Sequence, residues 1–153
     1  MTRVIIHAMA AIVASTAMEF AFAGVQEELV GKTCRAGYSN KSENAYGTIK
    51  VRFFMDGDKF VVGIQRAGAT YLLYAQSPDD KNDRQLGAEA IYPINIDGEE
   101  AEAITASGSK YRFIPAGAQL KGMIIPNRSA PGQGNFVNVT IDPERSACVR
   151  SNP

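Results

Sequence analysis

The sequence has no tryptophan, a single histidine and two cysteines, and its 16 basic side chains balance its 16 acidic ones. The formal net charge of zero excludes a protein that binds nucleic acid through bulk positive charge, and it excludes an acidic solvating tail. Hydrophobic residues make up 45% and charged residues 21% of the 153 positions, which is typical of one globular domain. We find no linker, internal repeat or low-complexity tract that would divide the chain.

The chain also lacks a hydrophobic run long enough to cross a membrane. Arg3 precedes an apolar stretch over residues 4–18, which is shorter than the roughly 20 residues that span the hydrocarbon core. Ala21-Phe22-Ala23 follows and gives the small-x-small pattern at which signal peptidases cleave. We therefore predict a secretory signal peptide over residues 1–23 and a single domain over residues 24–153. The mature protein is expected to be periplasmic or secreted, with no insertion into a membrane after cleavage.

Cleavage at this point would remove His7, so the exported chain would contain no histidine. Without histidine, neither a Ser-His-Asp nor a Cys-His catalytic arrangement can form, and metals that bind through imidazole lose their commonest ligand. Carboxylates alone can act as acid and base in glycosidase-type chemistry, and the candidates here are Asp56, Asp58 and Glu89. Asp56 and Asp58 flank Gly57 in a turn pattern, which is typical of solvated residues. We therefore predict a protein that is not an enzyme and that holds no metal and no cofactor.

The two cysteines, Cys34 and Cys148, lie close to the two ends of the predicted mature chain. An even number of cysteines in an exported protein usually forms disulfides, because the compartment is oxidising. A redox-active pair is the alternative, but the chain has no Cys-x-x-Cys spacing. We predict a structural disulfide that holds the first and last ordered segments side by side.

The interior of the chain has the period-two pattern of half-buried strands. Apolar and polar side chains alternate over residues 46–55, and a second alternating run over residues 60–64 follows the Asp56-Gly57-Asp58 turn, which predicts a hairpin. The other strand patterns cover residues 71–75, 88–96, 101–106, 110–114, 120–125 and 136–141. Pro93 suggests that its strand is an edge or contains a bulge, because proline cannot donate a ladder hydrogen bond. Only residues 25–30 have the pattern of a short helical turn.

These patterns predict an all-β fold of about eight strands in a single antiparallel meander. Such a meander either closes as a small barrel or folds into a β-sandwich. The positions of the cysteines favour the barrel, because closure makes the first and last strands neighbours and removes both exposed edges.

Two segments resemble parts of lipocalin-like barrels. Glu28-Leu29-Val30-Gly31-Lys32-Thr33 is similar to their Leu-x-Gly-x-Trp opening, with Thr33 in the place of the tryptophan. Further on, Tyr111-Arg112-Phe113, Gly117 and Leu120-Lys121-Gly122 resemble the strand, turn and strand of such barrels. The resemblance implies an antiparallel barrel with a cavity for an apolar ligand, and it carries over no binding residue.

Two functions remain open at this point. The first is a barrel that binds a small apolar ligand among inward aromatic side chains, which suit pockets because they combine apolar rings with orienting hydroxyls. The candidate lining is Phe53, Phe60, Tyr71, Tyr74, Tyr92, Tyr111 and Phe113, although the same residues could instead be packed core. The second is a protein-interaction module, such as a hydrolase inhibitor or envelope-associated factor. It would act through its loops, for example through Arg128 and Gln133 within residues 127–135.

Overall fold

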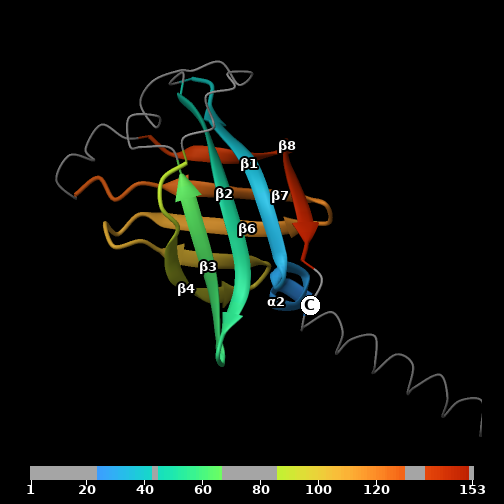
Figure 1. The fold of residues 1–153 in the computed structure, drawn as a ribbon. Helices are drawn as coiled ribbons and strands as arrows, with labels where there is room; N and C mark the ends of the chain where they lie inside the picture. Colours follow the sequence, from blue (N-terminus) through green and yellow to red (C-terminus); the bar gives the residue numbers. More distant parts are fainter. Residues whose placement is uncertain (1–23, 43–44, 67–85, 130–136, 152–153) are drawn as a thin grey trace, which may run out of the picture.

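The computed structural model describes residues 24–42, 45–66, 86–129 and 137–151, and within them eight strands form one closed antiparallel barrel in chain order (Figure 1). A six-residue helix, α2 (Gly24–Leu29), precedes the first strand. The strands are β1 (Lys32–Asn40), β2 (Ala45–Asp56), β3 (Lys59–Arg66), β4 (Ala90–Asp97), β5 (Glu100–Ile104), β6 (Lys110–Ala116), β7 (Gln119–Ile125) and β8 (Val139–Arg150). The prediction of a barrel is confirmed. The predicted signal peptide and the strand pattern at 71–75 lie outside the described residues.

The predicted hairpin over the Asp56-Gly57-Asp58 turn is present. Asp56 pairs with Lys59 across a two-residue turn, and the register continues to the pair of Ile49 with Arg66. Gly57 has a φ of 63°, a backbone conformation that glycine adopts without steric cost. This turn places the inward residues of β2 directly opposite those of β3.

Pro93 does not lie on an edge strand, because the closed barrel pairs β4 on both sides. It forms the last pair between β4 and β3, opposite Val61. From Ile94 onward β4 pairs with β5 instead, beginning opposite Ala103. Proline therefore occupies the position at which β4 changes partners, where the absence of its N–H donor interrupts neither ladder.

The predicted disulfide joins β1 to β8 and closes the barrel. Cys34 and Cys148 face each other in the register of these two antiparallel strands, with a Cα–Cα distance of 4.0 Å and an S–S distance of 2.04 Å. Cys34 is fully buried and belongs to the hydrophobic core. Because such bonds persist in oxidising surroundings, the disulfide indicates an oxidising, exported environment.

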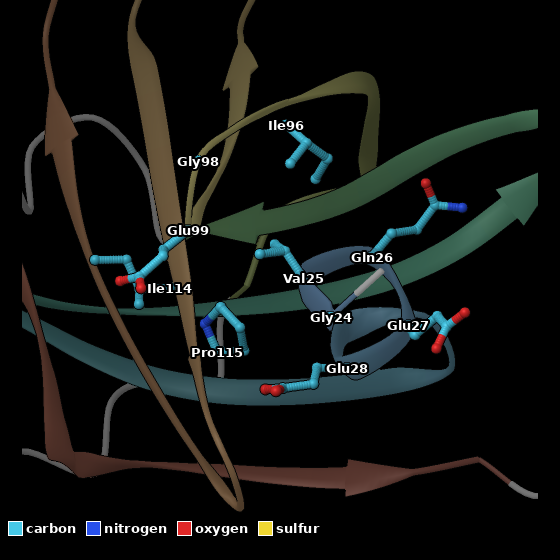
Figure 2. Close-up of a pocket in the computed structure, with 10 residues that line it drawn as sticks. All are labelled: Gly24, Val25, Gln26, Glu27, Glu28, Ile96, Gly98, Glu99, Ile114 and Pro115. Atoms are coloured by element: carbon cyan, nitrogen blue, oxygen red, sulfur yellow. The ribbon is translucent and has the colours of Figure 1, made fainter. Parts of the chain in front are cut away.

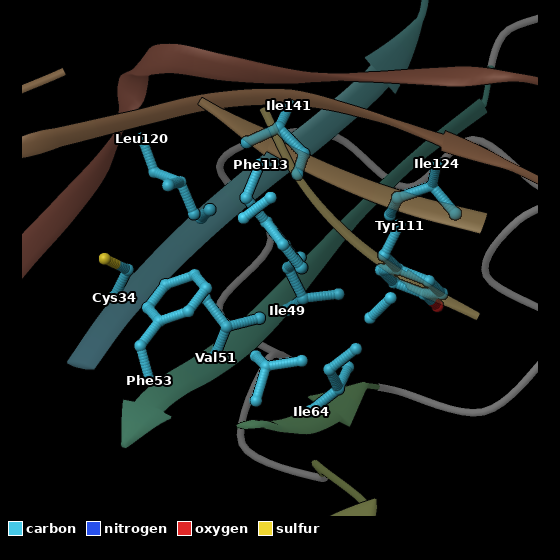
Figure 3. Close-up of a cluster of buried hydrophobic side chains, with 14 of the residues drawn as sticks. Cys34, Ile49, Val51, Phe53, Ile64, Tyr111, Phe113, Leu120, Ile124 and Ile141 are labelled. Carbon is cyan, nitrogen blue, oxygen red and sulfur yellow. The ribbon is translucent and has the colours of Figure 1, made fainter. Parts of the chain in front are cut away.

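The interior of the barrel is filled by aliphatic and aromatic side chains, among them Phe53, Tyr111 and Phe113 (Figure 3). The ring of Phe53 lies 5.2 Å from that of Phe113 in an edge-to-face contact and 6.5 Å from that of Phe60, centroid to centroid. Tyr111 packs 6.2 Å from Phe113. None of the four is more than 8% exposed. These rings therefore form one packed series that runs from the β2–β3 hairpin to Tyr111 on β6.

Gly122 allows β6 and β7 to approach each other closely. Its φ is +156°, and a Cβ atom there would lie 1.9 Å from the carbonyl oxygen of Arg112 on β6. We expect Gly122→Ala to lower the free energy of unfolding by roughly 1–3 kcal/mol in urea denaturation, since backbone would have to move. Gly24→Ala is the control, because a Cβ there meets nothing within 4 Å. Equal stability of the two variants would contradict this account.

Candidate functional site

The structure separates the predicted aromatic lining into two groups. Phe53, Phe60 and Phe113 are packed core, in accord with the alternative left open by the sequence. Tyr92 and Tyr111 line a pocket at one end of the barrel. Tyr71 and Tyr74, the other two predicted lining residues, lie outside the described residues.

This pocket, the tyrosine pocket, has a volume of about 310 Å³. It lies at the end of the barrel where β3 ends at Arg66 and β4 begins at Ala90, opposite the end that carries α2. The residues that line it are Ile64, Arg66, Ala88, Ala90, Tyr92, Thr105 and Tyr111. The lining combines aliphatic side chains and aromatic rings with three hydroxyl groups and one guanidinium group, which is the composition of a site for a small molecule.

Arg66 and Tyr111 form the polar part of the tyrosine pocket. Nη1 of Arg66 donates a hydrogen bond to the hydroxyl oxygen of Tyr111 at 3.2 Å. Burial raises the pKa of Tyr111, and the nearby positive charge of Arg66 opposes this rise only in part. The phenol is therefore neutral at neutral pH, and its own proton remains available for donation. Among the described residues, no carboxylate lines the pocket and none forms an ion pair with Arg66.

A larger hollow, the α2 groove, lies at the other end of the barrel (Figure 2). Its volume is about 930 Å³, and it runs between α2, the turn from β4 to β5, and the end of β6. The apolar part of its wall consists of Val25, Ile96, Ile114 and Pro115. Gly24, Gln26, Gly98 and three carboxylate residues, Glu27, Glu28 and Glu99, complete the lining.

The candidate acid–base residues occupy separate places. Asp56, at the end of β2, and Asp58, in the turn that follows, are both exposed. Glu89 accepts two hydrogen bonds from Arg52, at 2.7 and 3.2 Å, and this contact lowers the pKa of the Glu89 carboxyl. A general acid needs the opposite shift. Within the described ranges, no three His, Cys, Asp or Glu residues are grouped so as to hold a metal ion.

The loop predicted as an interaction site is described only in part. Asn127 donates from Nδ2 to the carbonyl oxygen of Ser107 at 3.0 Å, which holds the start of the loop against the turn between β5 and β6. Arg128 is exposed and donates to the side-chain oxygen of Asn138 at 3.3 Å. Gln133 lies outside the described residues.

Sequence reasoning missed Arg66 as a pocket residue, although the pattern contained the signal. Phe60, Val62 and Ile64 point inward along β3, and one further step of the same period-two alternation reaches Arg66. No helix in the described part of the chain is long and apolar enough to cross a membrane. Comparison with protein-family models, with curated proteins and with solved structures finds no match to this chain.

Proposed function

We propose that this protein is an exported, non-enzymatic binding protein whose tyrosine pocket holds a small molecule with an apolar body and an anionic group. The observation that carries the proposal is the Arg66 guanidinium, which lies in an otherwise apolar and hydroxyl-lined pocket and hydrogen-bonds to Tyr111. A buried disulfide and the predicted signal peptide support export.

The arrangement of the barrel supports binding at its end. Because Phe53, Phe60 and Phe113 are packed in the core, a ligand would occupy the tyrosine pocket instead. Its apolar body would contact Ile64, Ala90 and the tyrosine rings, and its anionic group would accept charge-assisted hydrogen bonds from Arg66. The resemblance to lipocalin-like barrels, which implies a cavity for an apolar ligand, agrees with this proposal.

A pair of naphthalene dyes tests the proposal, because one is anionic and the other is neutral. Anilinonaphthalene sulfonate carries the charge that Arg66 would bind, whereas N-phenylnaphthylamine has the same kind of apolar body without it. We expect both dyes to fluoresce on binding to the oxidised protein. Arg66→Gln should lower the affinity for the anionic dye about tenfold or more, since hydrogen bonds to charged groups contribute roughly 1.5–3 kcal/mol. The same substitution should change the affinity for the neutral dye by no more than about twofold.

Arg128→Gln is the matched control, because Arg128 is an exposed arginine that does not line the pocket. It should leave the affinity for both dyes unchanged, and all variants should unfold at the temperature of the native protein. Equal weakening by Arg66→Gln and Arg128→Gln would refute the pocket as the binding site. So would the absence of binding by either dye.

A further inference from the structure

The charges of this neutral chain are unevenly placed in the fold. Glu89, Glu100, Glu102 and Asp142 each form an ion pair with an arginine. Apart from Glu100, six carboxylates at the end of the barrel that carries α2 have no ion-pair partner among the residues that the structure describes. They are Glu27 and Glu28 on α2, Asp56 and Asp97 at the ends of β2 and β4, and Asp58 and Glu99 in the turns that follow these strands.

Two cations at this end, Arg150 and Lys32, donate hydrogen bonds to backbone carbonyl groups. Arg150 donates from its two terminal nitrogens to the carbonyl oxygens of Val30 and Glu28, at 2.6 and 2.9 Å. Lys32 donates to the carbonyl oxygen of Gly117 at 3.0 Å, and Glu28 acts on it only through the longer-range field. The carboxylates of the α2 groove therefore remain available to a partner. Cleavage after Ala23 would add one amino group at Gly24, and the three carboxylates would still outnumber it.

The α2 groove is held open by fixed elements. Leu29, at the end of α2, is buried in the core with 1% exposure, and Arg150 binds the carbonyl oxygens that the end of the helix leaves unpaired. Across the groove from α2, Ile96 is 44% exposed, and it shares the lining with Val25, Ile114 and Pro115 (Figure 2). An exposed isoleucine in a concave apolar wall offers contact area to an occupant.

We propose that the α2 groove binds an extended basic segment of a partner protein, in which apolar side chains alternate with lysine or arginine. In an extended chain, successive side chains point to opposite sides, so one set can pack on Ile96, Ile114 and Pro115. The other set can reach the carboxylates of Glu27, Glu28 and Glu99, which also line the groove. An anionic membrane surface or a nucleic acid would be repelled by the same carboxylates, so charge complementarity selects a cationic polypeptide. This inference does not depend on the tyrosine pocket, which lies at the other end of the barrel.

Nuclear magnetic resonance titration of the ¹⁵N-labelled, oxidised protein tests the inference. The probe is a capped peptide of alternating lysine and leucine, KLKLKLK. Two matched peptides replace either the lysines by glutamate or the leucines by serine. We expect the lysine–leucine peptide to shift the amide signals of α2, of the turn between β4 and β5, and of the end of β6. Binding should weaken as salt is added, because exposed charges are screened. Neither matched peptide should shift these signals at the same concentration.

Variants of the groove separate its two contributions. Changing Glu27, Glu28 and Glu99 together to glutamine should lower the affinity for the lysine–leucine peptide about tenfold, since each exposed charge pair adds a modest amount to the binding free energy. Ile96→Ser should also lower the affinity for this peptide several-fold, because apolar contact is lost. Glu144→Gln, at an exposed carboxylate outside the groove, should have no effect.

Three results would overturn the inference. They are shifts that map away from the groove, equal binding of the lysine–serine peptide, and unchanged binding by the triple glutamine variant. Arg66→Gln should not alter peptide binding, so failure of the α2 groove and failure of the tyrosine pocket are distinguishable. Thermal unfolding of each variant checks that the barrel is intact.

Discussion

Replacing Cys34 and Cys148 together by alanine is expected to lower the free energy of unfolding by roughly 4 to 5 kcal/mol. The two residues are 114 positions apart, and the bond between them shortens the chain that is free to explore conformations in the unfolded state. In the chain-entropy account, a loop of this length gives a stabilisation close to the upper end of what a disulfide supplies. Urea denaturation of the oxidised protein and of the double variant measures the difference.

Reduced native protein is the control for this experiment. Reduction should add the mass of two hydrogen atoms, and it should bring the stability close to that of the double alanine variant. A loss below about 1 kcal/mol in the double variant would show that the noncovalent pairing of β1 with β8 already supplies most of the closure. Such a result would contradict the role we assign to the bond.

Phe53→Ala is expected to lower the free energy of unfolding by about 3–5 kcal/mol. The Phe53 side chain is fully buried and its ring contacts the rings of both Phe60 and Phe113. Truncation would remove these contacts and leave a cavity in the middle of the barrel, where close packing leaves little freedom to collapse. Chemical denaturation gives the value directly.

The next residue in the chain provides a matched control. Phe54 is only partly buried, and the guanidinium carbon of Arg52 lies 4.0 Å from the centre of its ring. Phe54→Ala should cost about 1 kcal/mol or less, as is usual for a surface position with one cation–π contact. If the two alanine variants were equally stable, the aromatic cluster would not be the core that the structure indicates.

The closure of the barrel was predictable from the sequence, but its first strand was not. The hairpin of β2 and β3 follows from strong apolar alternation around an Asp-Gly turn. In β1 the buried positions include Cys34, Ala36 and Tyr38, and the first two are too small to give a clear alternating signal. This strand is stabilised instead by its pairing with β2 on one side and β8 on the other, which are contacts distant in sequence. The sequence patterns do not predict β1. The eight expected strands instead include residues 71–75, and those residues lie outside the described part of the chain.

The candidate site was predictable in its residue types and only partly in its position. Alternation indicates which face of a strand a side chain occupies, but not how far along the barrel it lies. Tyr111 and Phe113 both point inward from β6, yet only Tyr111 reaches the pocket. That depth depends on the stagger of neighbouring strands, which is set by pairing around the whole barrel. The α2 groove depends in the same way on where the helix packs, and no local pattern specifies it.

The bond between Cys34 and Cys148 also determines how the molecule would carry mechanical load. A pull applied to the two ends of the chain passes from Cys34 directly to Cys148, so residues 35–147 lie outside the path of tension. Under force, only the segments before Cys34 and after Cys148 can be extended, to at most about 3.6 Å per residue. In the reduced protein the same pull would act on β1 and β8, the two strands that close the barrel. The oxidised barrel is therefore shielded from tension on its termini, whatever is attached to them.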